Sequence, residues 1–219
     1  MSFSQVNNSK FTLQPSTSEE LWLVFDIETN GLYDDVTETF CIVCHDISNN
    51  QTHKFKPDQI NQALQLLSKA DVLIGHNILF YDLPVLNKLY KITFSARIID
   101  TLICTRLIWP KEVLYDLDEN SYDQVPPALK GSASLKAWGY RLSNHKIDFK
   151  DFSEYSQEML DYCVQDVLVT SNLLKYIVKQ NYSQPALQLE HEFAIYIQKQ
   201  IREGIPFDID AALDLVDVL

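Results

Sequence analysis

No part of the 219-residue sequence contains a hydrophobic run long enough to cross a membrane. A spanning helix needs roughly 18 or more predominantly apolar residues in succession. The N-terminus is polar and has neither the basic region nor the apolar region of a secretory signal. We therefore expect no membrane association and predict a cytoplasmic protein.

Cysteine is also scarce, with four residues, Cys41, Cys44, Cys104 and Cys163. Each lies within an apolar or helical pattern, which favours reduced, packed thiols over a disulfide framework. The Cys41-x-x-Cys44 spacing occurs in zinc and redox sites, but there is no second pair, so we favour a structural role. The neighbouring His45 is predicted to lie on the surface of a hairpin rather than to bind a metal.

Basic residues are few, with 18 Lys and Arg against 30 Asp and Glu, which gives a formal net charge of −12 at pH 7. Tight, sequence-indifferent binding of duplex DNA depends on many Lys and Arg contacts to phosphates. The charge therefore argues against that kind of binding. It does not exclude an enzyme that holds only a few nucleotides at a strand end through metal ions and aromatic or apolar side chains.

What the sequence does contain is enough apolar material, 46% of residues, for one sizeable core. The stretch at 21–30 reads Leu-Trp-Leu-Val-Phe-Asp-Ile-Glu-Thr-Asn. Side chains alternate along a strand, so Asp26 and Glu28 are predicted to project from the same face at the end of a buried strand. Such a pair needs a cation or a proton to offset its repulsion. Taken alone, the motif is more often a solvated strand end.

The remaining pattern predicts an α/β fold in which a mixed central sheet is flanked by helices. Residues 1–20 are polar and lack periodicity, so we expect a flexible arm outside the core. A long loop is expected at 111–131. Strands are expected near 21–27, 40–46, 52–55, 72–74 and 97–99, and helices from 57, from 82, and at 100–109, 134–141, 154–180 and 208–219.

Two further acidic sites lie at helix positions. Asp82 begins a helix, where the simple interpretation is an N-cap. Tyr162 and Asp166 are four residues apart on a helix, so they share a face, and that face is apolar and directed inward. Together with Asp26 and Glu28, these residues provide four carboxylates and a phenol, which suits phosphodiester hydrolysis with two divalent metal ions.

Two other residues in these patterns have structural interpretations. Asp100 directly precedes the helix expected at 100–109, so we interpret it as a helix cap and structural acid rather than a metal ligand. Trp138 lies in the helix expected at 134–141 and is interpreted as part of the core.

At this point the sequence resembles a known family, the tyrosine branch of the DEDD exonucleases, which have a ribonuclease-H-like fold. Within that branch it is most similar to the N-terminal proofreading domains of the A-family DNA polymerases of T-odd bacteriophages. The spacing from Asn77 to Asp82 is one residue longer than is usual in the branch and matches the phage group. Five stretches carry the resemblance: residues 25–32 (Phe-Asp-Ile-Glu-Thr-Asn-Gly-Leu), 76–86, 99–108, 135–142 (Leu-Lys-Ala-Trp-Gly-Tyr-Arg-Leu) and 159–167.

The resemblance implies a 3′-to-5′ exonuclease that acts on single-stranded DNA ends with two Mg²⁺ or Mn²⁺ ions, in host cytoplasm if the protein is phage-encoded. It also assigns roles to residues. Tyr162 would orient the attacking water, because a phenol with a pKa near 10 is a poor base at neutral pH. The metal ligands would be Asp26, Glu28, Asp82 and Asp166, and the contacts to the terminal nucleotide would be Thr29, Leu32 and Asn77.

The expected domain organisation is an arm at 1–20, an exonuclease domain at 21–182 and a helical segment at 183–219. The last segment is similar to the one that enters the polymerase domain in the phage enzymes. Its apolar stripe predicts a polymerase partner, either in the same chain or as a separate chain, and the sequence leaves both open. Two alternatives also stay open: an exonuclease acting on RNA, and a non-catalytic module that docks on a polymerase.

Overall fold

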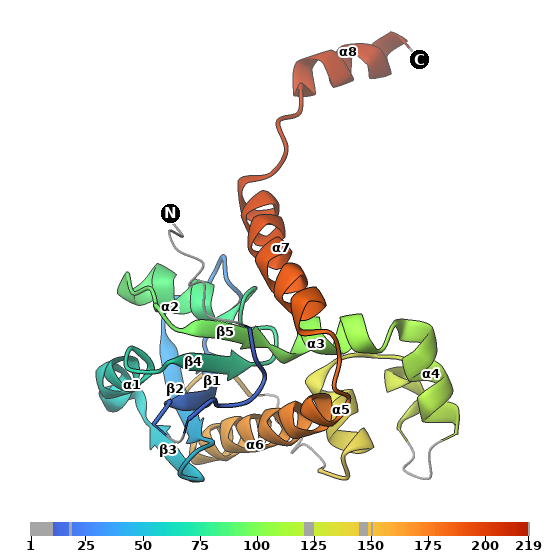
Figure 1. Cartoon of the computed structure of the whole chain (residues 1–219). Coiled ribbons are helices and arrows are strands. Elements are labelled where there is room, and N and C mark those ends of the chain that lie inside the picture. The colour runs from blue at the N-terminus through green and yellow to red at the C-terminus, as the bar shows by residue number, and fades with distance from the viewer. Residues whose placement is uncertain (1–10, 18, 121–124, 145–148, 150, 219) are drawn as a thin grey trace.

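The computed structural model describes residues 11–17, 19–120, 125–144, 149 and 151–218. Its centre is a five-stranded sheet in the order β3-β2-β1-β4-β5 (Figure 1). Strand β1 pairs antiparallel with β2 and parallel with β4, so the predicted mixed sheet is confirmed. The strands are β1 (Trp22–Thr29), β2 (Thr39–Asp46), β3 (Gln51–Phe55), β4 (Val72–Gly75) and β5 (Arg97–Asp100).

Strand β1 is buried on both faces, which explains its nearly continuous apolar sequence. Trp22 and Val24 belong to a hydrophobic cluster on one face, and Leu23 and Phe25 belong to a second cluster on the other. Helices α1 (Ile60–Leu67) and α2 (Asp82–Tyr90) pack on the second face. The first face is covered by α3 (Thr101–Ile108), α5 (Leu135–Arg141), α6 (Gln157–Lys179) and the start of α7 (Gln184–Glu203).

Side-chain caps begin four of these helices: α3, α5, α6 and α7. Asp100 accepts a hydrogen bond from Leu102 N–H at the start of α3, so its predicted role as a cap is confirmed. Ser134 begins α5, which carries the fully buried Trp138 into the core as predicted. Ser156 caps α6, so this helix begins at residue 157 instead of the predicted 154.

The prediction of a long loop at 111–131 is wrong. Helix α4 (Lys111–Glu119) begins directly after Pro110, and a short 3₁₀ helix, η2 (Pro127–Leu129), follows. Five acidic residues in the stretch suggested a solvated loop, but Leu114 is 1% exposed and Asp118 forms a buried ion pair with Arg141 of α5. These two contacts fix α4 against the body of the protein.

The prediction that residues 1–20 lie outside the core is wrong for Phe11 and Leu13, whereas residues 14–17 are exposed. Phe11 and Leu13 are 6% and 4% exposed and join the hydrophobic cluster on the first face of the sheet. The ring of Phe11 lies 5.2 Å from that of His191 on α7. Residues 1–10 fall outside the described part of the chain. Isolated apolar residues in a polar stretch give no periodic signal, which is why local pattern missed them.

The histidine and cysteine predictions had different outcomes. All four cysteines are free and buried, as expected. His45 was predicted on the hairpin surface, but it is 5% exposed and its Nδ1 lies 3.0 Å from Thr52 Oγ1.

In the part of the chain that the structure describes, no helix is both long enough and apolar enough to span a membrane.

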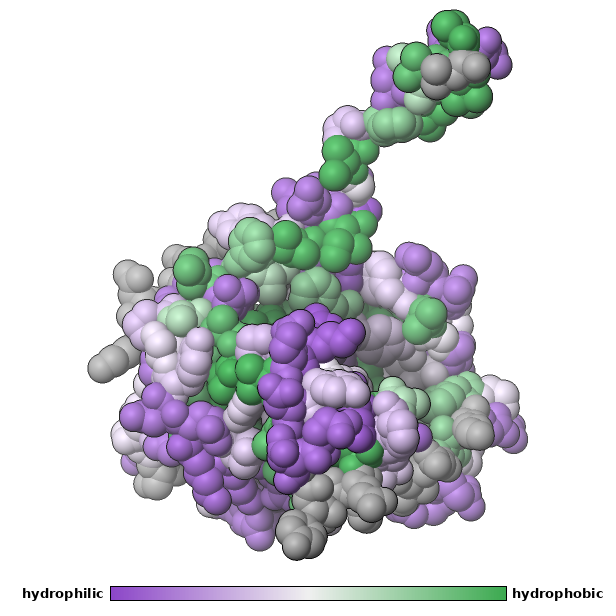
Figure 2. Space-filling view, turned by 90° about the vertical axis from the view of Figure 1, so that its right-hand side faces the viewer, coloured by the Kyte–Doolittle hydropathy of each residue, from purple (hydrophilic) through white to green (hydrophobic). Residues whose placement is uncertain are grey.

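Beyond α7, the chain leaves the body and ends in α8 (Ile209–Val218), none of whose residues is buried (Figure 1). The space-filling view shows hydrophobic residues, drawn in green, concentrated on this projecting segment (Figure 2). Its large hydrophobic side chains that are at least half exposed are Ile205, Phe207, Ile209, Leu213, Leu215, Val216 and Val218.

Candidate active site

The acidic pair of β1 lies on the face of the sheet that α6 covers. Asp26 and Glu28 alternate with Ile27, which belongs to the cluster on the opposite face, so both carboxylates project toward α6. There they meet Cys163, and one ligand atom from each of the three residues lies within 4.8 Å of the others. The Cys163 Sγ is 3.6 Å from Asp26 Oδ2. Two carboxylates and a thiol therefore converge at one point.

Asp82 reaches the same place from the first turn of α2. Its side chain is buried, and the backbone N–H of Ile27, between the two acids of β1, is close enough to act on its carboxyl and lower the pKa. Burial raises the pKa of the Asp82 carboxyl to about 7, and the nearby carboxylates of Asp100 and Asp166 act in the same direction. A cation at this point would reverse that effect, because it favours the charged carboxylate.

Asp166 comes from the middle of α6 and is 6% exposed. It is close enough to Asp82 to raise the pKa of that carboxyl. Acids from three segments that are far apart in sequence thus lie near one another: Asp26 and Glu28 beside Cys163, and Asp82 within electrostatic range of Asp166. The spacing of Cys163 and Asp166, three residues apart on one helix, places both on the side that faces β1.

Tyr162 precedes Cys163 on α6 and is half-buried. Its ring lies 5.8 Å from that of Phe149 and 6.2 Å from that of Phe152. These aromatic contacts fix the position of the ring. The link between Tyr162 and the acids is its four-residue spacing from Asp166.

The residues expected to contact a terminal nucleotide lie around the acids. Thr29 ends β1 and is buried, whereas Leu32 in the following loop is 78% exposed. Asn77 lies in the turn after β4 in a left-handed conformation, with φ of 70°. The Leu32 side chain is therefore available to a ligand.

Sequence reasoning gave no role to Tyr81, which links these two segments. Its hydroxyl donates a 2.6 Å hydrogen bond to Gly31 O and also contacts Thr29 Oγ1. Burial raises the pKa of this phenol. The position of Tyr81 directly before Asp82 was a signal that it lies near the site. Its hydrogen-bond partner Gly31, however, is fifty residues away in the sequence, and no local pattern identifies that contact.

Asp100 organises the turn that carries Asn77. Its fully buried carboxylate accepts hydrogen bonds from the backbone N–H groups of Asn77 (2.9 Å), Leu79 (3.1 Å) and Leu102 (2.9 Å). These backbone bonds occupy the carboxylate, so Asp100 serves as a structural acid.

An open cavity of about 480 Å³ lies beside Asn77. Its walls include Arg106 of α3, Lys111 of α4 and Trp109 between them. Arg106 and Lys111 are exposed, whereas Trp109 is 8% exposed. In a chain of net charge −12, two cations beside an aromatic ring form a local environment that suits a phosphate backbone.

The donor set fits divalent metal ions. Carboxylate oxygens are the ligands that Mg²⁺ and Mn²⁺ prefer. The Cys163 thiol is the one soft donor in the group, and burial raises its pKa well above the usual value, so it stays protonated. The oxygen atoms of the acids, and not the sulfur, are therefore suited to hold the ions.

Comparison with known proteins identifies the family. Residues 23–178 match the RNase_H superfamily, and this region contains all the acids described above. The chain belongs to the RNase_H superfamily. This assignment agrees with the mixed sheet and with the resemblance noted in the sequence.

The chain is also similar to phage polymerases. The chain is 30% identical, over 241 aligned residues, to the DNA-directed DNA polymerase of Enterobacteria phage T3 and, equally, to that of Escherichia phage T7. Each match covers 88% of this chain and 34% of the relative, so the chain spans about a third of the length of these curated relatives.

Among solved structures, the chain resembles NrnC of Brucella melitensis bound to pGG. The TM-score is 0.56 at 16% sequence identity, and the match covers 86% of this chain and 88% of that one. At this level of identity the likeness establishes the shared fold.

Proposed function

We propose that this chain is a 3′-to-5′ exonuclease that hydrolyses phosphodiester bonds at single-stranded DNA ends, and that it is the exonuclease part of a phage DNA polymerase. The observation that carries the proposal is the pair of acids at the end of β1, Asp26 and Glu28, which meet Cys163 of α6, with Asp82 and Asp166 interacting electrostatically nearby. Membership of the RNase_H superfamily and the similarity to two phage polymerases support it.

The four acids are proposed to hold two divalent ions, Mg²⁺ or Mn²⁺. Bound there, the ions would supply Lewis-acid stabilisation of the scissile phosphate and activation of water. The role of the protein is to bring four carboxylates together at a buried strand end. That arrangement is costly without a cation, as the raised pKa of Asp82 indicates.

The remaining side chains are proposed to bind and orient the reactants. Tyr162 would orient the attacking water by a hydrogen bond, because a phenol is a poor general base at neutral pH. Leu32 would pack against the terminal base, and Thr29 and Asn77 would contact the same nucleotide. The next phosphates would enter the cavity beside Asn77, where Arg106 and Lys111 lie.

The segment at 183–219 is proposed to connect to a polymerase domain, in the same chain or in a separate one. The support is its exposed apolar side chains together with the length of the phage relatives, of which this chain spans about a third.

A digestion assay tests the proposed activity. A 5′-labelled single strand of DNA should be shortened from its 3′ end with Mg²⁺ or Mn²⁺ and spared in the presence of a chelator. The double variant Asp26→Ala with Glu28→Ala should be inactive. A matched control, Glu158→Ala with Asp161→Ala, removes two exposed acids of α6 and should digest normally. Unchanged digestion by the Asp26 and Glu28 variant would contradict the assigned site. A matched RNA strand measures the preference for DNA.

A further inference from the structure

Helix α7 uses one face to contact the body of the protein, and the chemistry of that face changes along the helix. Its first residues on this face, Leu187, His191 and Ala194, are buried. Gln198 and Arg202 continue the same face, because they follow at spacings of four. The inward side thus becomes polar where α7 passes beyond the hydrophobic core.

The middle of α7 is bonded to the turn at 76–81, which carries Asn77. His191 Nε2 accepts a 2.8 Å hydrogen bond from the backbone N–H of Asp100, the residue whose carboxylate holds Asn77 and Leu79. Gln198 donates directly from its side-chain amide to Leu79 O. The turn is therefore held by α7 both directly and through Asp100.

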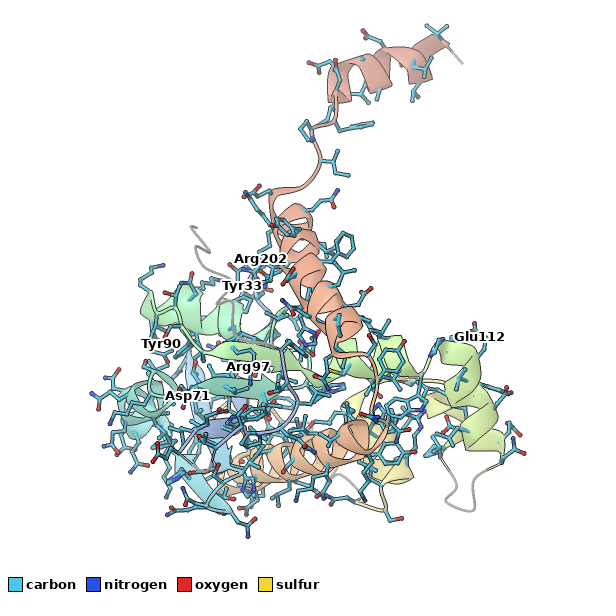
Figure 3. The ribbon with its side chains drawn as sticks, viewed as in Figure 1. Tyr33, Asp71, Tyr90, Arg97, Glu112 and Arg202 are labelled. Atoms are coloured by element: carbon cyan, nitrogen blue, oxygen red, sulfur yellow. The ribbon has the colours of Figure 1, made fainter. Side chains whose placement is uncertain are left out.

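The end of α7 contacts the loop at 30–38, which carries Leu32. The Arg202 guanidinium lies 3.9 Å from the centroid of the Tyr33 ring, and the two side chains lie together at the top of the domain (Figure 3). The same loop is also held by α2, because Lys88 Nζ donates hydrogen bonds to Tyr33 O (2.6 Å) and Asp34 O (2.8 Å). Arg202 thus restrains the residue next to the exposed Leu32.

We propose that Gln198 and Arg202 are positioning residues, which hold the 76–81 turn and the 30–38 loop in the conformation that binds the terminal nucleotide. This inference rests on the proposed function. Both segments carry proposed nucleotide contacts, and Tyr81 already ties one to the other. Binding a strand to mobile segments costs conformational entropy, because the segments must become ordered. If α7 orders them before the strand binds, that entropic cost is not part of the binding free energy. Loss of the two contacts should therefore raise KM and leave kcat unchanged.

The test compares α7 variants in two measurements. The variants are Gln198→Met, Arg202→Met and the double substitution. Matched controls are Gln200→Met and Lys199→Met, which alter exposed residues of the same turns. Arg202→Lys keeps a cation over Tyr33 and should largely restore the wild-type behaviour. Hydrogen exchange of the intact protein reports the order of the two segments without any substrate, and steady-state digestion of a single strand reports KM and kcat.

In the double variant we expect faster amide exchange at 30–38 and 76–81, and a KM raised by about fivefold with kcat unchanged. The controls should match the wild type. Unchanged exchange in the two segments overturns the inference, as does faster exchange with an unchanged KM. A fall in kcat alone also overturns it, because that result assigns the contacts to the chemical step. A wild-type protein that shortens neither DNA nor RNA overturns the proposed function and this inference together.

Discussion

A single carboxyl group, that of Asp82, shows how burial alters the chemistry of a residue. Burial raises its pKa to about 7, and the other acids nearby add to the effect. The backbone N–H groups of Ile27 and of Asp82 itself lower the pKa and so partly offset this rise. The polypeptide therefore supplies some of the stabilisation that the charged form needs, and a bound cation is suited to supply the rest.

Gly75 is a second residue whose chemistry is decided by its surroundings. It ends β4, directly before the turn that carries Asn77. A Cβ atom here would lie 2.9 Å from the backbone oxygen of Phe25 on β1 and would overlap the side chain of Ile78. The close approach of β4 to β1 at this point thus requires glycine.

We therefore predict that Gly75→Ala destabilises the protein by about 1–3 kcal/mol, because the turn must move to relieve the overlap. The same shift should reduce nuclease activity. Urea denaturation measures the free energy of unfolding, and the digestion assay measures the activity. In the control variant, Gly31→Ala, the added methyl meets its neighbours at 3.5 Å or more and should be tolerated. Equal stability of both variants would contradict the packing argument.

At the scale of elements, an ion pair ties α4 to α5. Arg141 Nε and Nη2 donate to the two oxygens of Asp118 at 2.7 Å each, and both side chains are buried. Gly131 N–H donates to the same carboxylate at 2.8 Å. Burial alone would raise the pKa of Asp118, but the hydrogen bonds from Arg141 and Gly131 outweigh it and lower the pKa. The pair holds one wall of the cavity in place.

We predict that Asp118→Ala lowers the free energy of unfolding by roughly 3–5 kcal/mol, because Arg141 is left buried without its partner. Since the folded state lowers the pKa of Asp118, its contribution is complete above the usual Asp pKa of about 3.9 and is lost as the pH falls through the folded value. The difference between wild type and variant should therefore shrink in acid. Urea denaturation at pH 7 and near pH 3 measures it.

The neighbouring pair provides a control for that experiment. Lys130 Nζ lies 2.6 Å from Glu119 Oε1, but both side chains are partly exposed. Glu119→Ala should therefore change the free energy of unfolding by less than about 1 kcal/mol. A similar loss in both variants would show that burial does not set the strength of the Asp118 pair.

At the scale of the whole molecule, the charge distribution limits how the protein can hold a strand. The net charge of −12 repels phosphates, and the cavity beside Asn77 offers two cations, Arg106 and Lys111. Each phosphate contact on a single strand contributes about −0.7 to the slope of log affinity against log salt. Binding should therefore depend only modestly on salt.

We predict a slope of about −1.4 for the wild type, as expected for two phosphate contacts. Arg106→Met with Lys111→Met should raise KM by about tenfold and bring the slope close to zero. Measurements of KM from low to moderate NaCl test both statements. Lys69→Met with Lys179→Met removes two exposed cations outside the cavity and should change neither value. If the salt slope of the Arg106 and Lys111 variant stays near the wild-type value, the phosphates bind outside this cavity.

Local periodicity in the sequence was enough to predict the mixed sheet, the shared face of Asp26 and Glu28, the inward side of the helix that carries Asp166, and the cap at Asp100. These features depend on residues a few positions apart, and the strand and helix repeats determine which of them share a face. The tertiary structure alone decided the burial of Phe11 and Leu13, the helix α4, the approach of Cys163 to Asp26, the link from Tyr81 to Gly31, and the path of α7 over the two loops. Each of these depends on partners brought together by chain packing across long separations, and no spacing within a local segment encodes such a contact.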